Sequence, residues 1–477
     1  MEHQAPSTLQ RLAVVSLLKK EEALAISAVV GLPWFLFPAT FEVAFRNNHT
    51  NILRAMVPAW PFTCLPVGAL MKTPHLETLK ALLDGLDVLI TEEACPGRGK
   101  TRVLDLTDVN SDFWSIWIGT YKKDCSHQDM RQKKSVETCC YSVVKKYLNV
   151  VTDLKLVNSQ LDECTMYLWQ WAQQRKGSVH LCCQKLEIWA DSSDVIDILQ
   201  SVDLHCIREL KVTYLQIEDM ALFGSYLGQM RNLHTLMLED IMNTYRNIDS
   251  EELKEEWMNT LFSQLPKLHC LLHLYVDYIH VLVGSLAEWL RHLKNPLETL
   301  SITCCHLIQR DLDYLPQCLN LCGLKHLYMS YTILEELKPL GKLLERVKDT
   351  LQTLDLEHCW LEDSAFSDFM PALSQCSQLL KINFVNNKLS LPLLKQLLQH
   401  TAKLNKLTQE LYPVPLECYD NRDQVIIERF DEICPKLLDI LRSKRQPKAA
   451  SFVSTICRKC FRSCVYDLEG RHCLCWQ

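Results

Sequence analysis

Four cysteines near the end of the chain have the type and the spacing that could bind a metal. They form two close pairs, Cys457-x-x-Cys460 and Cys473-x-Cys475, with twelve residues between the pairs. Two pairs joined by a short loop are the layout of a structural zinc ribbon, in which four thiolates fill every position on the metal. The C-x-C pair departs from the usual C-x-x-C, so unliganded thiols are the alternative. A disulfide is disfavoured in a reducing compartment.

The segment Gly97-Arg-Gly-Lys-Thr101 is similar to the end of a phosphate-binding loop, but its context is wrong. The first glycine of G-x-x-x-x-G-K-T would fall at position 94, which is Ala94. A helical pattern precedes the segment and a strand pattern follows it, the reverse of what a phosphate loop needs. No H-E-x-x-H or G-x-S-x-G motif occurs, and glycine is scarce at 13 residues in 477. The sequence therefore indicates a protein that is not an enzyme.

One pattern returns along the chain and predicts the elements that must position any functional side chain. Its clearest copy is Leu297-x-x-Leu300-x-Ile302-x-x-Cys305-x-Leu307. Further copies follow at intervals of 27, 27 and 28 residues, beginning at Leu324, Leu351 and Leu379. Looser copies begin at Ile207, Leu233 and Leu271. This period and signature predict an α/β solenoid, a leucine-rich-repeat horseshoe with parallel strands inside and helices outside.

The positions within one repeat explain this fold. Leu300 and Ile302 are two residues apart, so they point to the same side of a strand, into the repeat. The Cys or Asn slot, as at Cys305, turns inward, where it can satisfy backbone groups of the loop. The remaining residues form an outer helix, and repeats must stack because one repeat cannot bury its own apolar face. Strands pair about 4.8 Å apart and helices about 8–10 Å apart, so the sheet is concave.

The polar positions of the same strands would face a bound protein. The predicted target-binding face consists of Thr299, Ser301, Thr303, His326, Tyr328, Ser330, Thr353, Asp355 and Glu357. These side chains are mixed in charge and do not identify the bound protein. The interval from Leu233 to Leu271 is 38 residues, which predicts an acidic insertion at about 239–262. This insertion would project from the surface, either as a binding loop or as an inert one.

The composition limits the class of protein. A net charge of −6 over 477 residues gives no basic footprint, so we expect no direct binding of nucleic acid. The uncharged stretch 23–41 is interrupted by Gly31, Pro33 and Pro38, which predicts buried helices rather than a membrane span. The chain has 23 cysteines and no secretory signal, which favours reduced, buried thiols and a cytoplasmic protein. A nuclear location is the alternative, because residues 119–146 form a basic loop.

Two short linear patterns occur in the first 45 residues. The first has the form of a BC box, the helix by which substrate receptors bind elongin C, at positions Leu9, Ala13 and Leu17. The second has the form of a cullin box, at positions Phe37, Pro38, Phe41 and Phe45. An apolar row at this spacing is usually the core-facing side of a helix. The order and spacing of the two patterns favour a helix that docks in a groove of a partner, with Leu9 as its anchor.

A second apolar row weakens the assignment of the first. The segment Ala23-Leu24-x-x-x-Ala28-x-x-x-Leu32 also satisfies the BC-box pattern. The pattern alone therefore does not decide which helix would bind elongin C, and the core-facing interpretation stays open for both.

Longer blocks along almost the whole chain resemble the PRAME family. They include Ala59-Trp-Pro-Phe-Thr-Cys-Leu-Pro66, Asn295-Pro-Leu-Glu-Thr-Leu-Ser-Ile-Thr303 and Leu411-Tyr-Pro-Val-Pro-Leu-Glu417. The resemblance implies a germline-expressed leucine-rich-repeat protein that is a substrate receptor of a cullin-RING ubiquitin ligase. It also implies repression of transcription in some members. The BC-box positions of the family carry over as Leu9, Ala13 and Leu17.

These observations together predict an adaptor. Its expected parts are a helical N-terminal cap at 1–95, a solenoid at 96–411, a C-terminal cap and linker at 412–450, and a Cys-rich tail at 451–477. Elongin B/C and a cullin would be its partners, and a target held on the concave face would be ubiquitinated and degraded. The alternative is a non-ligase scaffold or corepressor that binds transcription regulators. We expect no cofactor apart from structural zinc.

Overall fold

The computed structural model describes most of the chain as two compact units. The described residues are 9–71, 75–91, 101–107, 113–114, 148–156, 161–189, 199–200, 202–215, 220–241, 251–279, 283–334, 336–422, 424–456 and 462–472. The first unit consists of Met1–Glu187 with Ser192–Ile207, and the second of Ile188–Asp191 with Arg208–Gln477. The basic loop at 119–146, and Cys457, Cys460, Cys473 and Cys475, lie outside the described residues.

Four helices begin the first unit. They are α1 (Leu9–Leu18), α2 (Glu22–Val30), α3 (Phe37–Arg46) and α4 (Thr50–Met56). The uncharged stretch 23–41 is therefore divided between two helices, and Pro38 stands in the first turn of α3, where its missing N–H costs nothing. Among the described residues, every helix is too short or too polar to cross a bilayer.

An aromatic core packs α3 against the chain that follows it. Trp60 is fully buried, donates its indole N–H to the carbonyl of Cys64 at 2.9 Å, and meets Phe41 edge-on at 5.1 Å between ring centroids. Trp114 stacks on Phe41 at 5.8 Å and donates to the carbonyl of Pro66 at 2.6 Å. Both indoles thus bury a large apolar surface while their single polar group is satisfied.

The first unit continues with α5 (Leu76–Thr91), which packs against α4, and α8 (Glu163–Gln173), which packs against α5. Asp87 of α5 accepts two hydrogen bonds from the Arg175 guanidinium, at 2.5 and 2.6 Å. The strands of this unit are β1 (Cys64–Pro66), β2 (Val103–Asp105), β3 (Leu148–Leu156) and β4 (Val179–Trp189). The first three pair in parallel, in register at Leu65, Leu104 and Val150, which are all fully buried.

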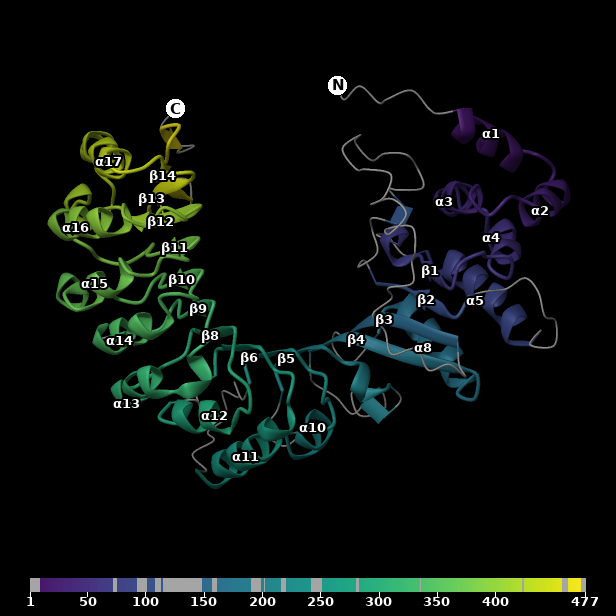
Figure 1. Cartoon of the computed structure of the whole chain (residues 1–477), viewed down its shortest axis with the longest axis horizontal. Helices are drawn as coiled ribbons and strands as arrows, with labels where there is room; N and C mark the ends of the chain where they lie inside the picture. The colour runs from purple at the N-terminus through teal and green to yellow at the C-terminus, as the bar shows by residue number, and fades with distance from the viewer. Residues whose placement is uncertain are drawn as a thin grey trace. The chain divides into compact units, whose positions relative to one another are not determined.

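The second unit is a curved stack of strand–helix repeats (Figure 1). Its parallel strands are β5 (Glu209–Thr213), β6 (Thr235–Glu239), β7 (His273–Asp277), β8 (Thr299–Thr303), β9 (His326–Tyr328), β10 (Thr353–Asp355), β11 (Lys381–Asn383), β12 (Gln409–Pro413) and β13 (Ala450–Ile456). On the outer side lie α10 (Met220–Leu227), α11 (Glu251–Gln264), α12 (Leu286–His292), α13 (Gln309–Tyr314), α14 (Lys338–Val347), α15 (Phe369–Leu373), α16 (Leu391–Thr401) and α17 (Ile427–Arg442). The prediction of an α/β leucine-rich-repeat solenoid is confirmed.

One apolar column runs through these strands from repeat to repeat. Its members are paired in register and none is more than 1% exposed: Leu210, Leu236, Leu274, Leu300, Leu327, Leu354 and Ile382. Because the column is continuous, each repeat covers the apolar face of its neighbour, as stacking requires.

The inward-turning slot of the repeat has the predicted role. The Asn387 amide donates to the carbonyls of Leu356 at 2.8 Å and Phe384 at 2.9 Å. Its side-chain oxygen accepts from the backbone N–H groups of Cys359 at 3.0 Å and Leu361 at 3.1 Å. One side chain thereby satisfies four buried backbone groups of the loop. In the equivalent slot, burial raises the pKa of the Cys359 thiol to about 12, so it stays protonated.

Two segments differ from simple repeats. The acidic insertion is helical from Glu251 onward, in α11, and residues 242–250 lie outside the described part of the chain. Beyond residue 411 the parallel sheet continues through β13, and β14 (Ser463–Tyr466) and β15 (Arg471–His472) then pair in antiparallel fashion. These last two strands cover the edge that the parallel sheet would otherwise expose.

Candidate functional site

Two rows of side chains face away from the apolar column of the second unit. Side chains alternate along a strand, so residues on either side of each column leucine share the opposite, concave face. One row contains Glu209, Thr235, His273, Thr299, His326 and Thr353. The next row contains Lys211, Met237, Tyr275, Ser301, Tyr328 and Asp355. Strand register therefore assembles this face from residues that are far apart in sequence.

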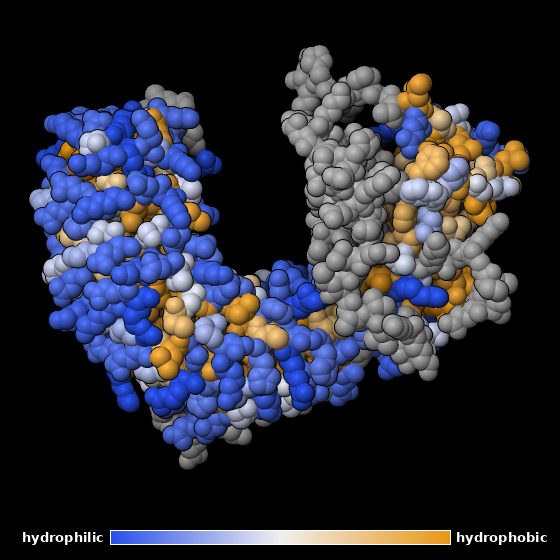
Figure 2. Space-filling view, in the orientation of Figure 1, coloured by the Kyte–Doolittle hydropathy of each residue, from blue (hydrophilic) through white to orange (hydrophobic). Residues whose placement is uncertain are grey.

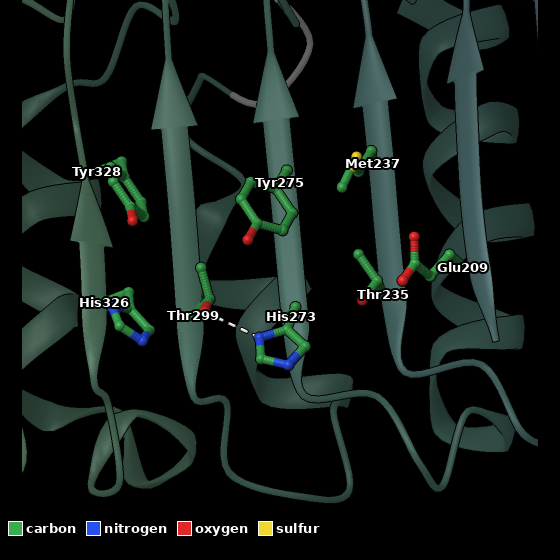
Figure 3. Close-up of a pocket in the computed structure, with 8 residues that line it drawn as sticks. All are labelled: Glu209, Thr235, Met237, His273, Tyr275, Thr299, His326 and Tyr328. Carbon is green, nitrogen blue, oxygen red and sulfur yellow. Dashed lines mark hydrogen bonds between the residues drawn. The ribbon is translucent and has the colours of Figure 1, made fainter. Parts of the chain in front are cut away.

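A hollow of about 330 Å³ lies on this face, across β5 to β9 (Figure 3). Eight residues line it: Glu209, Thr235, Met237, His273, Tyr275, Thr299, His326 and Tyr328. We refer to it as the concave hollow. It brings together three residues of the predicted target-binding face, which come from β8 and β9. The other five were missed because their repeats match the pattern loosely, although the same offset from Leu210, Leu236 and Leu274 would have found them.

Two histidines of the concave hollow are fixed by threonines of the neighbouring strand. His273 Nδ1 lies 2.9 Å from Thr299 Oγ1, and His326 Nδ1 lies 3.0 Å from Thr353 Oγ1. Both threonines are buried, at 2% and 8% exposed, so they position the rings and offer a partner little surface. Burial lowers the pKa of His326 below its usual value of 6.5, and the charges of His273 and Lys325 lower it further. The ring is therefore neutral at pH 7.

Beyond the hollow, the predicted residues Thr303, Ser330, Asp355 and Glu357 form an acidic edge, whereas Ser301 and Thr353 are buried. Thr303 Oγ1 donates to Asp277 at 2.5 Å, and Ser330 Oγ donates to Asp355 at 2.8 Å. The Asn383 amide donates to Glu357 at 2.9 Å. The strand residues on this face from β5 to β11 include the carboxylates of Glu209, Glu239, Asp277 and Asp355 and the ammonium groups of Lys211 and Lys381. Lys211 is paired with Glu239 at 2.7 Å, so negative charge remains in excess. The face therefore favours a positively charged segment.

The N-terminal helices present a different surface. In α1 the side chains of Leu9 and Leu12 are 86% and 55% exposed, and Ala13 is exposed, whereas Val14 and Leu18 are buried. Leu17, the third BC-box position, is half-buried. Figure 2 shows hydrophobic surface over these helices. The predicted BC-box row is thus not the side of α1 that packs into the unit.

Nearby apolar side chains are exposed as well. Leu24 of the second matching row is 60% exposed, so exposure does not distinguish the two rows. Trp34 and Phe35, between α2 and α3, are also exposed and contact each other edge-on at 6.0 Å. The sequence did not predict this pair, because neither residue belongs to the BC-box or the cullin-box pattern.

The cullin-box positions lie in the aromatic core of the first unit. Phe37 and Phe41 are 2% and 0% exposed, and Pro38 and Phe45 are also buried. Their side chains pack the fold in this structure. A cullin contact at these positions stays a prediction, and Trp34 and Phe35 are the neighbouring aromatic side chains within a partner's reach.

Comparison with known proteins covers almost the whole chain. The PRAME N-terminal domain model matches residues 5–114, and the PRAME C-terminal domain model matches residues 148–475. The chain is 48% identical to Oogenesin-3 of Mus musculus, over 97% of this chain and 93% of that protein. It is 44% identical to mouse Oogenesin-2 (99% and 98%) and 40% identical to PRAME family member 12 of Homo sapiens (99% and 98%).

A solved structure gives a much weaker match. A chain in the crystal structure of the Rad7 and Elc1 complex in yeast aligns with a TM-score of 0.28 and 14% identity, over 58% of this chain and 80% of that chain.

Proposed function

We propose, because the chain belongs to the PRAME family, that it is a protein-recognition subunit of a cullin-RING ubiquitin ligase. In this role the chain does no chemistry of its own. One surface would bind the ligase through elongin B/C and a cullin, and another would hold the protein to be ubiquitinated. The observation that carries the proposal is the exposed apolar row of α1.

The ligase-binding surface would be α1. Leu9 is 86% exposed, so its side chain contributes almost nothing to the fold. Burying a leucine completely is worth about 1.5–3 kcal/mol, which a hydrophobic groove on a partner would supply. Val14 and Leu18 meanwhile hold the other side of the helix in the unit. A helix fixed on one side and apolar on the other matches the helix-in-groove mode of binding.

The target-binding surface would be the concave hollow with its acidic edge. Tyr275 and Tyr328 offer flat side chains that lose little conformational entropy on binding, a property that makes tyrosine frequent at protein interfaces. The Asp355 carboxylate lies on the next strand in register with Tyr328, Glu357 follows it by two residues, and both attract cations. We therefore expect the target to present an exposed basic segment.

Binding to purified elongin B/C tests the ligase side, with Leu9→Ser as the variant and Leu24→Ser as its matched control. Both leucines are exposed and hold the same place in the two matching rows. We expect Leu9→Ser to weaken binding by about 10–100-fold, or about 1.4–2.8 kcal/mol, while Leu24→Ser has no effect. Neither change should alter Tm. The opposite result would assign the docking helix to α2.

If the wild-type chain captures neither elongin B/C nor a cullin, the ligase role is wrong. A non-ligase scaffold or corepressor that binds transcription regulators then becomes the better description. The target side is tested separately, by proximity labelling with the wild-type chain and with Tyr275→Ala plus Tyr328→Ala. A target should be labelled only by the wild type, and its abundance should rise when the proteasome is inhibited.

A further inference from the structure

Several side chains of metal-ligating types meet in the first unit, and none of them belongs to the two surfaces described above. His180 Nε2 lies 3.0 Å from Asp203 Oδ2, and Cys206 Sγ lies 3.8 Å from the same oxygen. The ligand atoms of these three residues are all within 4.8 Å of one another. Cys182 follows His180 by two residues on β4, so it shares the same side of the strand, and its thiol hydrogen-bonds with that of Cys206.

We propose that His180, Cys182, Asp203 and Cys206 form a structural zinc site. Their order in the chain gives two short pairs, His180-x-Cys182 on β4 and Asp203-x-x-Cys206 in the turn η3 (Leu204–Cys206) and the residue before it. Two ligand pairs from two elements are the usual construction of a structural zinc site, because the metal then ties the elements together. The ligand atoms of His180, Asp203 and Cys206 are already grouped, and Cys182, which contacts Cys206, would supply the fourth ligand by turning its side chain toward them. A metal held by all four side chains would have no open position for catalysis.

The distances suit this ion. Zinc binds imidazole nitrogen at about 2.0–2.1 Å, carboxylate oxygen at about 2.0–2.2 Å and thiolate sulfur at about 2.3 Å. Tetrahedral geometry then places nitrogen and oxygen about 3.3 Å apart, and sulfur and oxygen about 3.5 Å apart. The observed nitrogen–oxygen separation of 3.0 Å is slightly shorter than this, and the observed sulfur–oxygen separation of 3.8 Å is slightly longer. Small side-chain rotations would therefore bring His180, Asp203 and Cys206 to coordination distance around one ion.

A buried asparagine orients the imidazole. His180 Nδ1 lies 3.2 Å from Asn149 Oδ1, and Asn149 is 2% exposed. With Nδ1–H donating to this oxygen, the neutral ring has only a lone pair at Nε2, which faces the Asp203 carboxylate. A cation between nitrogen and carboxylate satisfies both groups. Metal-binding histidines characteristically have their other ring nitrogen held by such a partner.

The backbone of η3 orients the other pair. Asp203 caps this helical turn, and its Oδ1 accepts the backbone N–H of His205 at 2.9 Å. Oδ2 of the same carboxylate is thereby directed toward His180 and Cys206. The turn also brings Cys206 back beside Asp203. The positions of both ligands are thus fixed by local structure before any metal binds.

The cysteine side of the site is buried and largely apolar, so a bound metal would be shielded from water there. Cys182 and Cys206 are buried in one cluster with Cys64, Val103 and Val151. The side chains of His180 and Asp203 are 19% and 36% exposed, which leaves a path from solvent on their side. When zinc binds, both thiols must release their protons to solvent. The ordinary alternative is a hydrogen-bonded His180 and Asp203 beside two protonated thiols.

The test uses the full-length chain in which Cys457, Cys460, Cys473 and Cys475 are changed to serine, so that the C-terminal cysteines cannot contribute. Bound zinc is measured by mass spectrometry after dialysis, and cobalt is then substituted to record its absorption spectrum. We expect about one zinc per chain. The cobalt spectrum should show tetrahedral ligand-field bands and thiolate-to-metal charge transfer.

Variants of the same protein assign the ligands. Cys206→Ser and His180→Ala should lose the metal, and Asn149→Ala should weaken zinc binding about 10–100-fold. Cys183→Ala is the matched control, because this buried neighbour of Cys182 lies on the other side of the strand and should leave the zinc content unchanged. If Cys206→Ser does not fold, the shift in Tm on adding zinc to the parent and to Asn149→Ala gives the same comparison.

Three results would overturn the proposal. The parent protein could bind no stoichiometric zinc, its cobalt derivative could lack thiolate charge transfer, or His180→Ala could retain full zinc content. None of these readouts depends on elongin binding or on ubiquitination.

Discussion

The outer side of α1 and the concave face of the second unit are built in opposite ways. α1 exposes leucine side chains that make no polar contacts and that only burial against a partner would satisfy. The concave face is mostly polar, and several of its hydroxyl, imidazole and carboxylate groups are already hydrogen-bonded to one another across strands. An apolar row binds tightly only to a groove that matches its shape. The partner that a polar face prefers, in contrast, can be changed by substituting a single side chain. This contrast suits a constant ligase contact and a variable target contact.

The largest expected effect is on stability, and it distinguishes buried from exposed apolar residues within the first unit. Phe41→Ala removes a fully buried ring that contacts Trp60 and Trp114. It should lower the free energy of unfolding by about 3–5 kcal/mol. Leu12→Ala, at a 55% exposed position, should change it by less than about 0.5 kcal/mol. Urea denaturation followed by tryptophan fluorescence measures both.

Equal losses of stability in the two variants would show that α1 packs in solution through the side that this structure leaves exposed. The BC-box row would then be a core face, and the contrast between the two surfaces would no longer hold.

The sequence predicted one of these surfaces better than the other. Repeat spacing alone located Thr299, His326 and Tyr328, because a strand with one apolar side has only one other side to present. Glu209, His273 and Tyr275 were missed where looser repeats hid the register. The BC-box and cullin-box rows look alike in sequence, yet Leu9 is exposed and Phe41 is buried. Which side of a helix is covered depends on residues far away in the chain, such as Trp114, and no local pattern records that.

The next effect concerns charge on the concave face. Asp355→Asn combined with Glu357→Gln keeps the shape of both side chains and removes two negative charges. Affinity for a fluorescent oligo-arginine peptide should fall about tenfold, equivalent to about 1.4 kcal/mol, and should depend less on salt than in the wild type. Fluorescence anisotropy at two ionic strengths gives both values.

Glu432→Gln is the control for this experiment, because Glu432 is paired with Lys436 on the outer helix α17. It should leave peptide binding unchanged. If it weakens binding as much as the double variant does, the peptide responds to net charge and the concave face has no special role.

A smaller effect is expected from the ion pair at the rim of the concave face. Lys325 Nζ lies 2.7 Å from a carboxylate oxygen of Glu298, and the two side chains are 39% and 36% exposed. Water screens a pair at this exposure, so Lys325→Gln should cost only about 0.2–1 kcal/mol in unfolding free energy. The same change leaves one more uncompensated carboxylate on the face, so the affinity for the oligo-arginine peptide should rise. An unchanged affinity would mean that the peptide does not bind on this side of the hollow.

The smallest expected effect is a pH dependence that comes from His326. Burial is the main cause that lowers its pKa in the folded chain below the usual 6.5, with added repulsion from His273, Lys325 and Lys381 and an opposing attraction from Glu298. As the pH falls, the imidazole of His326 is therefore protonated in the unfolded chain before it is protonated in the folded chain. The contribution of the neutral ring to stability is complete above about pH 6.5 and is lost as the pH falls through the lowered pKa.

Measuring Tm from about pH 7.5 down to about pH 5 for the wild type and for His326→Gln isolates this contribution. Burial also lowers the pKa of His400, but that residue is present in both proteins and cancels in the difference. We expect the Tm of the wild type to fall more steeply than that of the variant as the pH decreases. Parallel curves would mean that water reaches the ring fully in solution. The concave hollow would then be an open, fully hydrated surface. It would no longer be a partly desolvated polar site that contrasts with the exposed apolar row of α1.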